Sequence, residues 1–292
     1  MVKGELATGR FLIPYRVIGH GGEPLLCING AQQSMAVWRS FASRFCQEFR
    51  VVLWDSPGQG RARILSGPCS ITLDEQIGIV VDLTAHLGFG EVSIFAASWG
   101  AIVAAGFASA FPDRVGKLVL ASLGIQPNLA ILEMIRAGLS MADRGAKERI
   151  GPLMVEGFGK QIPEAYERRI VEQFQTISEE HLRVFYEHCD FVAGIRHISD
   201  LIDLRRIRAE TLLLIRGSDG TINQQHVHQA CADIPHARTM IVEDGGHFLH
   251  FETGREDILE LYHDLLVARE ADPPTDRPRV PLSALVSLEL QP

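Results

Sequence analysis

The stretch VSIFAASWGAIVAAGFASA, residues 92–110, decides the fold of this chain. Its first residues are apolar and predict a strand, its later residues are small and predict a helix, and Ser98 stands between them. A serine at such a sharp turn projects its Oγ above the end of a sheet, where the N-terminus of the following helix directs N–H groups at an oxyanion. Ser98 is therefore a candidate nucleophile, and helix capping is the alternative explanation for the motif.

Short apolar runs alternate with helical patterns on both sides of this stretch. Several of the runs are continuously apolar, which is typical of strands that are covered on both faces of a parallel sheet. The sequence therefore predicts an α/β fold with a mostly parallel sheet and helices on both faces. The predicted strands are residues 11–18, 25–29, 50–55, 92–95, 117–121, 211–216 and 238–242, and the predicted helices are residues 34–49, 73–87, 99–111 and 255–269.

The alternation of strands and helices is interrupted between Leu123 and Ile207. This part shows helical periodicity with charged faces, over residues 129–143, 147–158, 164–176, 178–193 and 198–205. Because it is too long for a crossover connection, we expect an inserted helical cap over the carboxyl edge of the sheet. The predicted units are the first part of the core at 1–122, the cap at 123–207, the second part of the core at 208–270, and an extended or disordered tail at 271–292.

Length, composition and net charge limit the number of domains and the kinds of partner that this chain can have. The chain has 292 residues, 46% of them hydrophobic, which is enough for one large domain. Its net charge of -8 argues against nucleic acid or an anionic membrane surface as the partner. Residues 92–111 lack charge, but the turn at Ser98 and the small residues argue against a membrane span. The first residues show no secretory signal, so we expect a cytoplasmic protein.

Neither a metal nor a cofactor is predicted. The five cysteines are widely spaced and form no C-x-x-C pair, which argues against a disulfide framework or a structural zinc site. His226 and His228 point to different sides of a predicted helix, and His250 is better read as a neighbour of His247 than as its partner in a metal site. The chain also lacks the glycine-rich fingerprints of dinucleotide and nucleotide sites.

A serine hydroxyl needs a base and an orienting acid to act as a nucleophile near neutral pH. The candidate base is His247, in the glycine-rich loop that follows the strand at 238–242. The candidate acid is Asp219, after the strand at 211–216, with Glu243 and Asp244 as alternatives. A plain turn residue is the other explanation for Asp219. The order serine, aspartate, histidine along the chain is the one expected for this kind of sheet.

An oxyanion needs two N–H donors in fixed positions. One is the amide of the residue after the nucleophile, Trp99. The other is expected from the loop after the strand at 25–29, where Gly30 allows close approach and Ala31 can donate its amide.

These residues and loops together resemble the α/β-hydrolase superfamily over residues 11–269. Within it, the sequences NGA at 29–31, ASWG at 97–100 and GHFL at 246–249 are similar to bacterial 3-hydroxyacyl transferases. Those enzymes make 3-(3-hydroxyalkanoyloxy)alkanoate, the precursor of rhamnolipids, or move 3-hydroxyacyl groups between acyl carrier protein and coenzyme A. Two features depart from that group: Gly220 holds the usual position of the acid, and DSPGQG at 55–60 is closer to ordinary hydrolases.

The resemblance implies an acyltransferase that uses 3-hydroxyacyl thioesters of acyl carrier protein or coenzyme A through an acyl-enzyme. An esterase, a lactonase or a carbon–carbon bond hydrolase with the same triad is the alternative, and a non-catalytic ligand-binding protein is a third possibility. Apolar residues of the cap would suit an acyl tunnel, although plain helix packing explains them equally well. The expected substrate-binding residues are Asn29, Gly30, Met134, Met154, Phe158 and Phe248.

Overall fold

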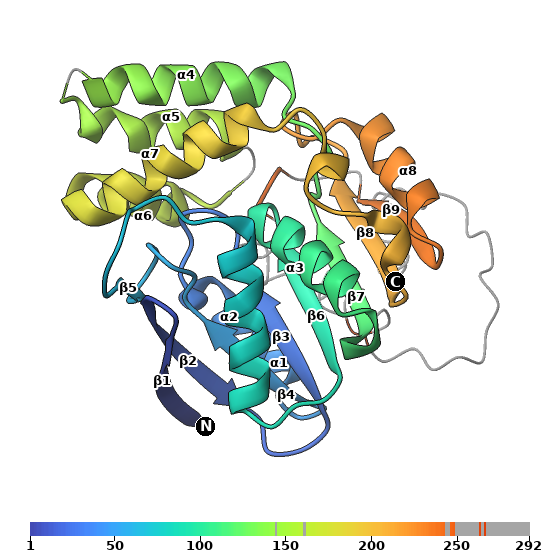
Figure 1. Cartoon of the computed structure of the whole chain (residues 1–292). Helices are drawn as coiled ribbons and strands as arrows, with labels where there is room; N and C mark the ends of the chain where they lie inside the picture. The colour runs from blue at the N-terminus through green and yellow to red at the C-terminus, as the bar shows by residue number, and fades with distance from the viewer. Residues whose placement is uncertain (144, 160–161, 243–245, 249–262, 264–265, 267–292) are drawn as a thin grey trace, which may run out of the picture.

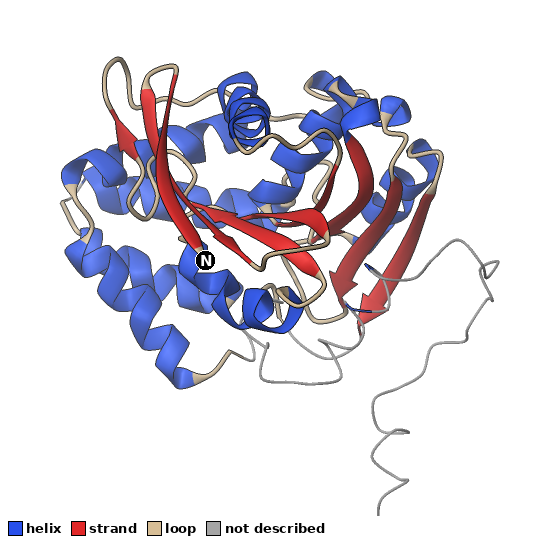
Figure 2. Cartoon of the chain, turned by 90° about the horizontal axis from the view of Figure 1, so that it is seen from below, coloured by secondary structure: helices blue, strands red, loops and turns tan. Residues whose placement is uncertain are grey.

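The computed structural model describes residues 1–143, 145–159, 162–242, 246–248, 263 and 266. Among them, nine strands form one twisted sheet in the order β1-β2-β4-β3-β6-β7-β8-β9, with β5 paired to β2 (Figures 1 and 2). Strands β4, β3, β6, β7, β8 and β9 pair in parallel, whereas β2 is antiparallel to β1, β4 and β5. The strands are β1 (Val2–Thr8), β2 (Phe11–Ile18), β3 (Glu23–Ile28), β4 (Phe49–Trp54), β5 (Arg63–Ile64), β6 (Val92–Ala97), β7 (Val115–Ala121), β8 (Glu210–Arg216) and β9 (Ala237–Val242).

The mostly parallel α/β architecture predicted from the sequence is confirmed. Strands β1 and β5 were not predicted, because β1 is a mostly exposed edge strand and β5 has only two residues. The predicted helix at 34–49 is shorter in the structure, with a 3-10 turn at Met35–Trp38 and α1 at Arg39–Phe45. The predicted helix at 255–269 and the tail at 271–292 lie outside the described residues, except for His263 and Leu266.

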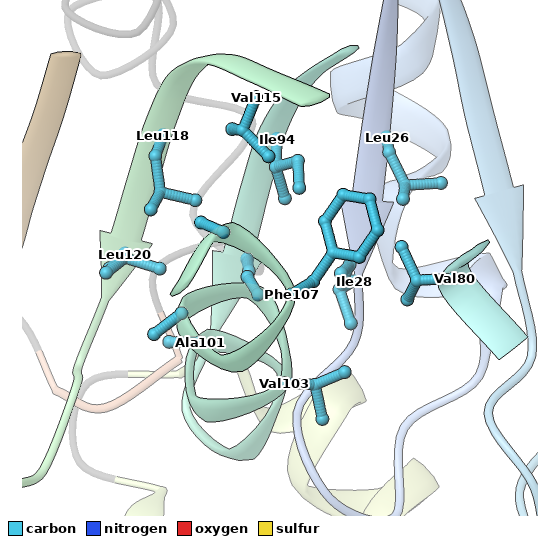
Figure 3. Close-up of a cluster of buried hydrophobic side chains, with 14 of the residues drawn as sticks. Leu26, Ile28, Val80, Ile94, Ala101, Val103, Phe107, Val115, Leu118 and Leu120 are labelled. Atoms are coloured by element: carbon cyan, nitrogen blue, oxygen red, sulfur yellow. The ribbon is translucent and has the colours of Figure 1, made fainter. Parts of the chain in front are cut away.

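Helices cover both faces of the sheet. On one face, α2 (Leu73–His86), α3 (Trp99–Ala110) and α8 (Gln224–Asp233) pack against the strands, and α1 packs against the other face. Neighbouring residues of a strand alternate between the two cores, as Leu25 and Leu26 of β3 do. This two-sided burial explains the continuous apolar runs. Figure 3 shows part of the first core, where strand residues Leu26, Ile28, Ile94, Leu118 and Leu120 lie with Val103 and Phe107 of α3 and Val80 of α2.

Four helices follow β7 and precede β8 in the chain: α4 (Leu129–Asp143), α5 (Ile150–Phe158), α6 (Glu164–Thr176) and α7 (Glu179–Gly194). They are grouped at one end of the sheet (Figure 1) and have a small apolar cluster of their own around Ile150, Phe174 and Phe185. The predicted helix at 147–158 is divided into a 3-10 turn at Lys147–Arg149 and α5, and residues 198–205 form only two short 3-10 turns. We call α4 to α7 the cap.

No helix among the described residues has both the length and the apolar character needed to cross a bilayer. The uncharged residues 92–111 are divided between β6 and α3, with Ser98 at the break.

Candidate active site

Ser98 lies in a strained turn between β6 and α3. Its backbone dihedrals are φ 53° and ψ -122°, in a region that residues other than glycine rarely adopt. The amide of Ser98 donates to the carbonyl of Ala121 at 2.8 Å, which ties the turn to the end of β7. Gly100 allows α3 to pass close to the end of β3, because a Cβ there would lie 2.4 Å from the carbonyl oxygen of Asn29. Strain of this kind is found at functional sites.

His247 and Asp219 continue from Ser98 in a line of hydrogen bonds. The Nε2 of His247 is 3.0 Å from the Oγ of Ser98, and its Nδ1 is 2.8 Å from Oδ2 of Asp219. An ionised Asp219 accepts from Nδ1–H, which leaves Nε2 free to accept the proton of the serine hydroxyl. The arrangement can therefore make Ser98 a nucleophile, with His247 as its base. Both His247 and Asp219 are buried.

Asp219 is held by three further donors. The hydroxyl of Ser122 donates to Oδ2 at 3.1 Å, and the amide of Thr221 donates to Oδ1 at 3.0 Å. The hydroxyl of Thr221 also donates to Oδ1 and lies 3.0 Å from Nδ1 of His247. Burial alone would raise the pKa of Asp219, but His247 and the donors of Thr221 together lower it to about 2. The alternative acids Glu243 and Asp244 lie outside the described residues.

The two predicted oxyanion donors both border the same cavity as Ser98. Neither the amide of Ala31 nor that of Trp99 donates a hydrogen bond to a described residue. The preceding amide, of Gly30, donates instead to Oε1 of Gln33 at 3.1 Å, and Gln32 has a positive φ of 61°. The loop after β3 is thus folded so that the amide of Gly30 is used internally and the amide of Ala31 stays available.

Asn29 supports this loop and is absent from the described lining of the cavity. Its Nδ2 donates to the carbonyl of Trp54 at 3.0 Å and to that of Gln33 at 3.3 Å, and its Oδ1 accepts from the indole of Trp38 at 2.7 Å. With its Nδ2 and its Oδ1 both engaged inside the protein, Asn29 fixes the loop to β4. A direct contact of Asn29 with substrate stays a prediction, and its observed contacts are those of a residue that supports the loop.

The cavity lies between the cap and the carboxyl ends of β6 and β7. Its volume is about 170 Å³, and its lining is mainly apolar. Met134, Met154 and Phe158, which the sequence predicted to bind substrate, line it, whereas Gly30 and Phe248 do not belong to the described lining. The ring centroids of Phe158 and His247 are 4.8 Å apart, and the ring of Phe248 packs against both.

Three polar residues at this site were not predicted from the sequence. Ser122 and Thr221 hold Asp219, and Thr221 lies only two residues after it, so proximity in sequence was a usable signal. His188 of α7 lines the cavity, and its ring centroid lies 4.6 Å from that of Trp99. His188 is three residues after Phe185 and four before Val192, so helical spacing could have assigned it to the apolar face of α7.

The fold is matched by similarity to known proteins. The chain belongs to the alpha/beta hydrolase family. The family model matches residues 25–261. A relative in this family is 2-hydroxy-6-oxononadienedioate/2-hydroxy-6-oxononatrienedioate hydrolase 2 of Pseudomonas putida, 25% identical over 82% of this chain and 86% of its own. Another is the (R)-3-hydroxydecanoyl-ACP:CoA transacylase of Pseudomonas aeruginosa, 22% identical over 79% of this chain and 76% of its own.

Among solved structures of the same fold, the enol-lactonase of Burkholderia xenovorans is similar with a TM-score of 0.76. It is 15% identical, and the match covers 90% of this chain and 100% of the lactonase. At this identity the similarity extends to the fold alone.

Proposed function

We propose that this alpha/beta hydrolase family member is a serine-dependent acyltransferase that accepts 3-hydroxyacyl groups from thioesters of acyl carrier protein or coenzyme A. The observation that carries the proposal is the hydrogen-bonded line of Ser98, His247 and Asp219 at the base of a mainly apolar cavity. A nucleophile at the end of an apolar cavity suits a substrate whose reactive carbonyl ends a hydrocarbon chain.

In the proposed first step, Oγ of Ser98 attacks the thioester carbonyl while Nε2 of His247 takes the hydroxyl proton. The amides of Ala31 and Trp99 stabilise the negative charge that develops on the carbonyl oxygen. When the tetrahedral intermediate collapses, the carbon–sulfur bond breaks and the departing thiolate takes the proton from His247. The product of this step is an ester of Ser98 and a free thiol.

In the proposed second step, an acceptor attacks the acyl-serine. His247 takes the proton of the acceptor, which is the hydroxyl of a second 3-hydroxyacyl group or the thiol of another carrier, and returns it to Oγ of Ser98. Transfer requires that this acceptor compete with water, and the apolar walls of the cavity favour a hydroxyl or thiol carried on a hydrocarbon chain over water. The NGA and ASWG sequences and the transacylase relative support the same choice.

Hydrolysis with the same triad is the second candidate function. It is favoured by the relative from Pseudomonas putida, which is named a hydrolase. The bond broken would be that of an ester, a lactone or a carbon–carbon bond, and water would replace the organic acceptor in the second step.

The test is to incubate the protein with a 3-hydroxyacyl thioester of acyl carrier protein or of coenzyme A and to identify products by mass spectrometry. An ester-linked dimer or acyl exchange between carriers is expected, and Ser98→Ala should abolish both. Free 3-hydroxy acid as the sole product would replace transfer by hydrolysis. If there were no turnover and an active-serine probe failed to label Ser98, the protein would be a ligand-binding member of the family.

A further inference from the structure

The polar side chains that line the cavity are few, and most of them belong to the triad network. Apart from the weakly polar thiol of Cys189 and the indole of Trp99, they are Ser98, Ser122, Thr221, His247, Gln126 and His188. The first four are linked to one another through Asp219 and His247. Gln126 is an exposed residue at the rim. His188 is therefore the polar side chain of the described lining that lies inside the cavity and takes no part in the triad.

The position of His188 is fixed relative to the nucleophile. Its ring meets the indole of Trp99 edge-on, with an interplanar angle of 76°, and Trp99 directly follows Ser98. The indole N–H of Trp99 donates to Oε1 of Gln76 at 2.9 Å, so Trp99 itself is anchored to α2. Phe191, on the same helix as His188, packs against the same indole. The imidazole is thus packed against an anchored indole that belongs to the residue directly after Ser98.

The nitrogens of His188 have no hydrogen-bond partner among the described residues, although the ring lies in an apolar wall. Burial lowers the pKa of His188 to about 4, so the imidazole is neutral near pH 7. A neutral imidazole has one N–H donor and one acceptor nitrogen. A hydroxyl group, which also donates and accepts, matches this pair, whereas a carboxylate only accepts and would prefer a cation.

We propose that His188 is a specificity-determining residue that binds the hydroxyl group of the hydroxyacyl chain as the chain enters the cavity and acylates Ser98. This inference rests on the acyl-enzyme chemistry proposed above. A residue of the cap would then bind the hydroxyl of the substrate. The same residue would distinguish hydroxyacyl chains from plain acyl chains. The triad itself contributes nothing to that discrimination, because its hydrogen bonds serve the carbonyl end of the substrate.

The experiment compares two chromogenic esters of equal chain length, one 3-hydroxyacyl and one unsubstituted, by the rate of the burst that reports acylation of Ser98. We expect the wild-type protein to acylate faster with the hydroxyacyl ester, by about tenfold, the effect of one neutral hydrogen bond. His188→Leu should lose this preference, because its rate with the hydroxyacyl ester falls about tenfold further than its rate with the unsubstituted ester. His188→Gln, which keeps a donor and an acceptor, should restore part of the preference.

His181→Leu is the matched control, because His181 lies on the same helix but not among the described lining residues of the cavity. It should leave the ratio of the two rates unchanged. If His188→Leu slowed acylation by both esters equally, His188 would be a packing residue and the proposal would fail. An unchanged ratio in His188→Leu would overturn it as well.

The outcome is independent of the identity of the acceptor, because a hydrolase and a transferase share the acylation step. A protein that acylates Ser98 and then releases free acid would contradict the proposed transfer while leaving the result for His188 valid. Failure of both esters to acylate Ser98 would overturn the two proposals together.

Discussion

At the scale of single residues, Ser98 shows how the surrounding structure imposes a conformation that a side chain disfavours. The turn is fixed by the hydrogen bond to Ala121 and by the close passage of α3 over β3 at Gly100, where no side chain fits. A positive φ at a residue other than glycine costs about 1–3 kcal/mol. The packing of β6 and α3 offsets that cost and keeps the hydroxyl of Ser98 toward His247.

We predict that Ser98→Gly and Ser98→Ala both lose the proposed acylation activity by at least about 10⁴-fold, because each removes the nucleophile. Ser98→Gly should nevertheless be more stable than Ser98→Ala by about 1 kcal/mol, because glycine accepts φ 53° without strain. Urea denaturation of the two variants measures the difference in the free energy of unfolding. Equal stability, or a more stable alanine variant, would show that the turn stores no strain.

Asp219 predicts a dependence of stability on pH. Because its pKa in the folded protein is lowered to about 2, its carboxylate stabilises the fold above the pKa of the unfolded chain, near 4. That contribution is lost as the pH falls toward 2. Between about pH 5 and pH 3, the wild-type protein should lose about 1 kcal/mol more of its free energy of unfolding than Asp219→Asn. Urea denaturation at several pH values checks this, and parallel losses in the two proteins would contradict it.

At the scale of elements, the cap meets the core at a glycine. Gly58, in the loop after β4, has a φ of 71°, and a Cβ there would lie 2.4 Å from Cγ1 of Val184 on α7. The loop can approach α7 this closely because it has no side chain at position 58. Since α7 also carries His188, this contact sets one wall of the cavity.

Gly58→Ala should therefore displace α7 and lower both stability and the rate of acylation. Gly9→Ala is its control, because Gly9 also has a positive φ, of 52°, but nothing lies within 4 Å of its added Cβ. We expect Gly9→Ala to cost about 1 kcal/mol, from the left-handed backbone alone, and to leave the rate unchanged. Gly58→Ala should cost about 1–3 kcal/mol more, since overpacking adds to the same backbone penalty. Similar losses in both variants would exclude a specific contact with the cap.

The elements that could be predicted from sequence are those in which apolar residues recur with the spacing of a helix or form the continuous run of a buried strand. The strand at 211–216 is apolar on both faces, and α4 and α6 have their predicted bounds. β1 escaped prediction because its pattern is that of an exposed edge. His188 and Ser122 escaped because their importance comes from neighbours far away in the chain, Trp99 and Asp219. No local pattern carries that information.

At the scale of the whole molecule, the parallel sheet collects the candidate catalytic groups at one edge. Ser98 follows β6, Ser122 follows β7, Asp219 follows β8 and His247 follows β9, and these strands are neighbours in that order. The carboxyl ends of neighbouring parallel strands lie side by side, so loops far apart in sequence meet there. The order of serine, aspartate and histidine could be predicted for this reason, although their distances could not.

Ser122 gives this arrangement a further consequence. Its hydroxyl reaches the carboxylate of Asp219 from the adjacent strand, and its φ of 53° is one that aspartate tolerates better than most residues. An aspartate at position 122, after β7, should therefore be able to replace Asp219, after β8, as the acid of the triad. We expect Ser122→Asp combined with Asp219→Ala to regain at least tenfold of the activity that Asp219→Ala loses, in the acylation assay. Ser122→Asn in the same background, which has the shape but not the charge, should regain none. Recovery would mean that the fold has two alternative positions for the carboxylate, 122 after β7 and 219 after β8. An ancestral or redesigned protein could then move the acid from one position to the other without changing the sheet.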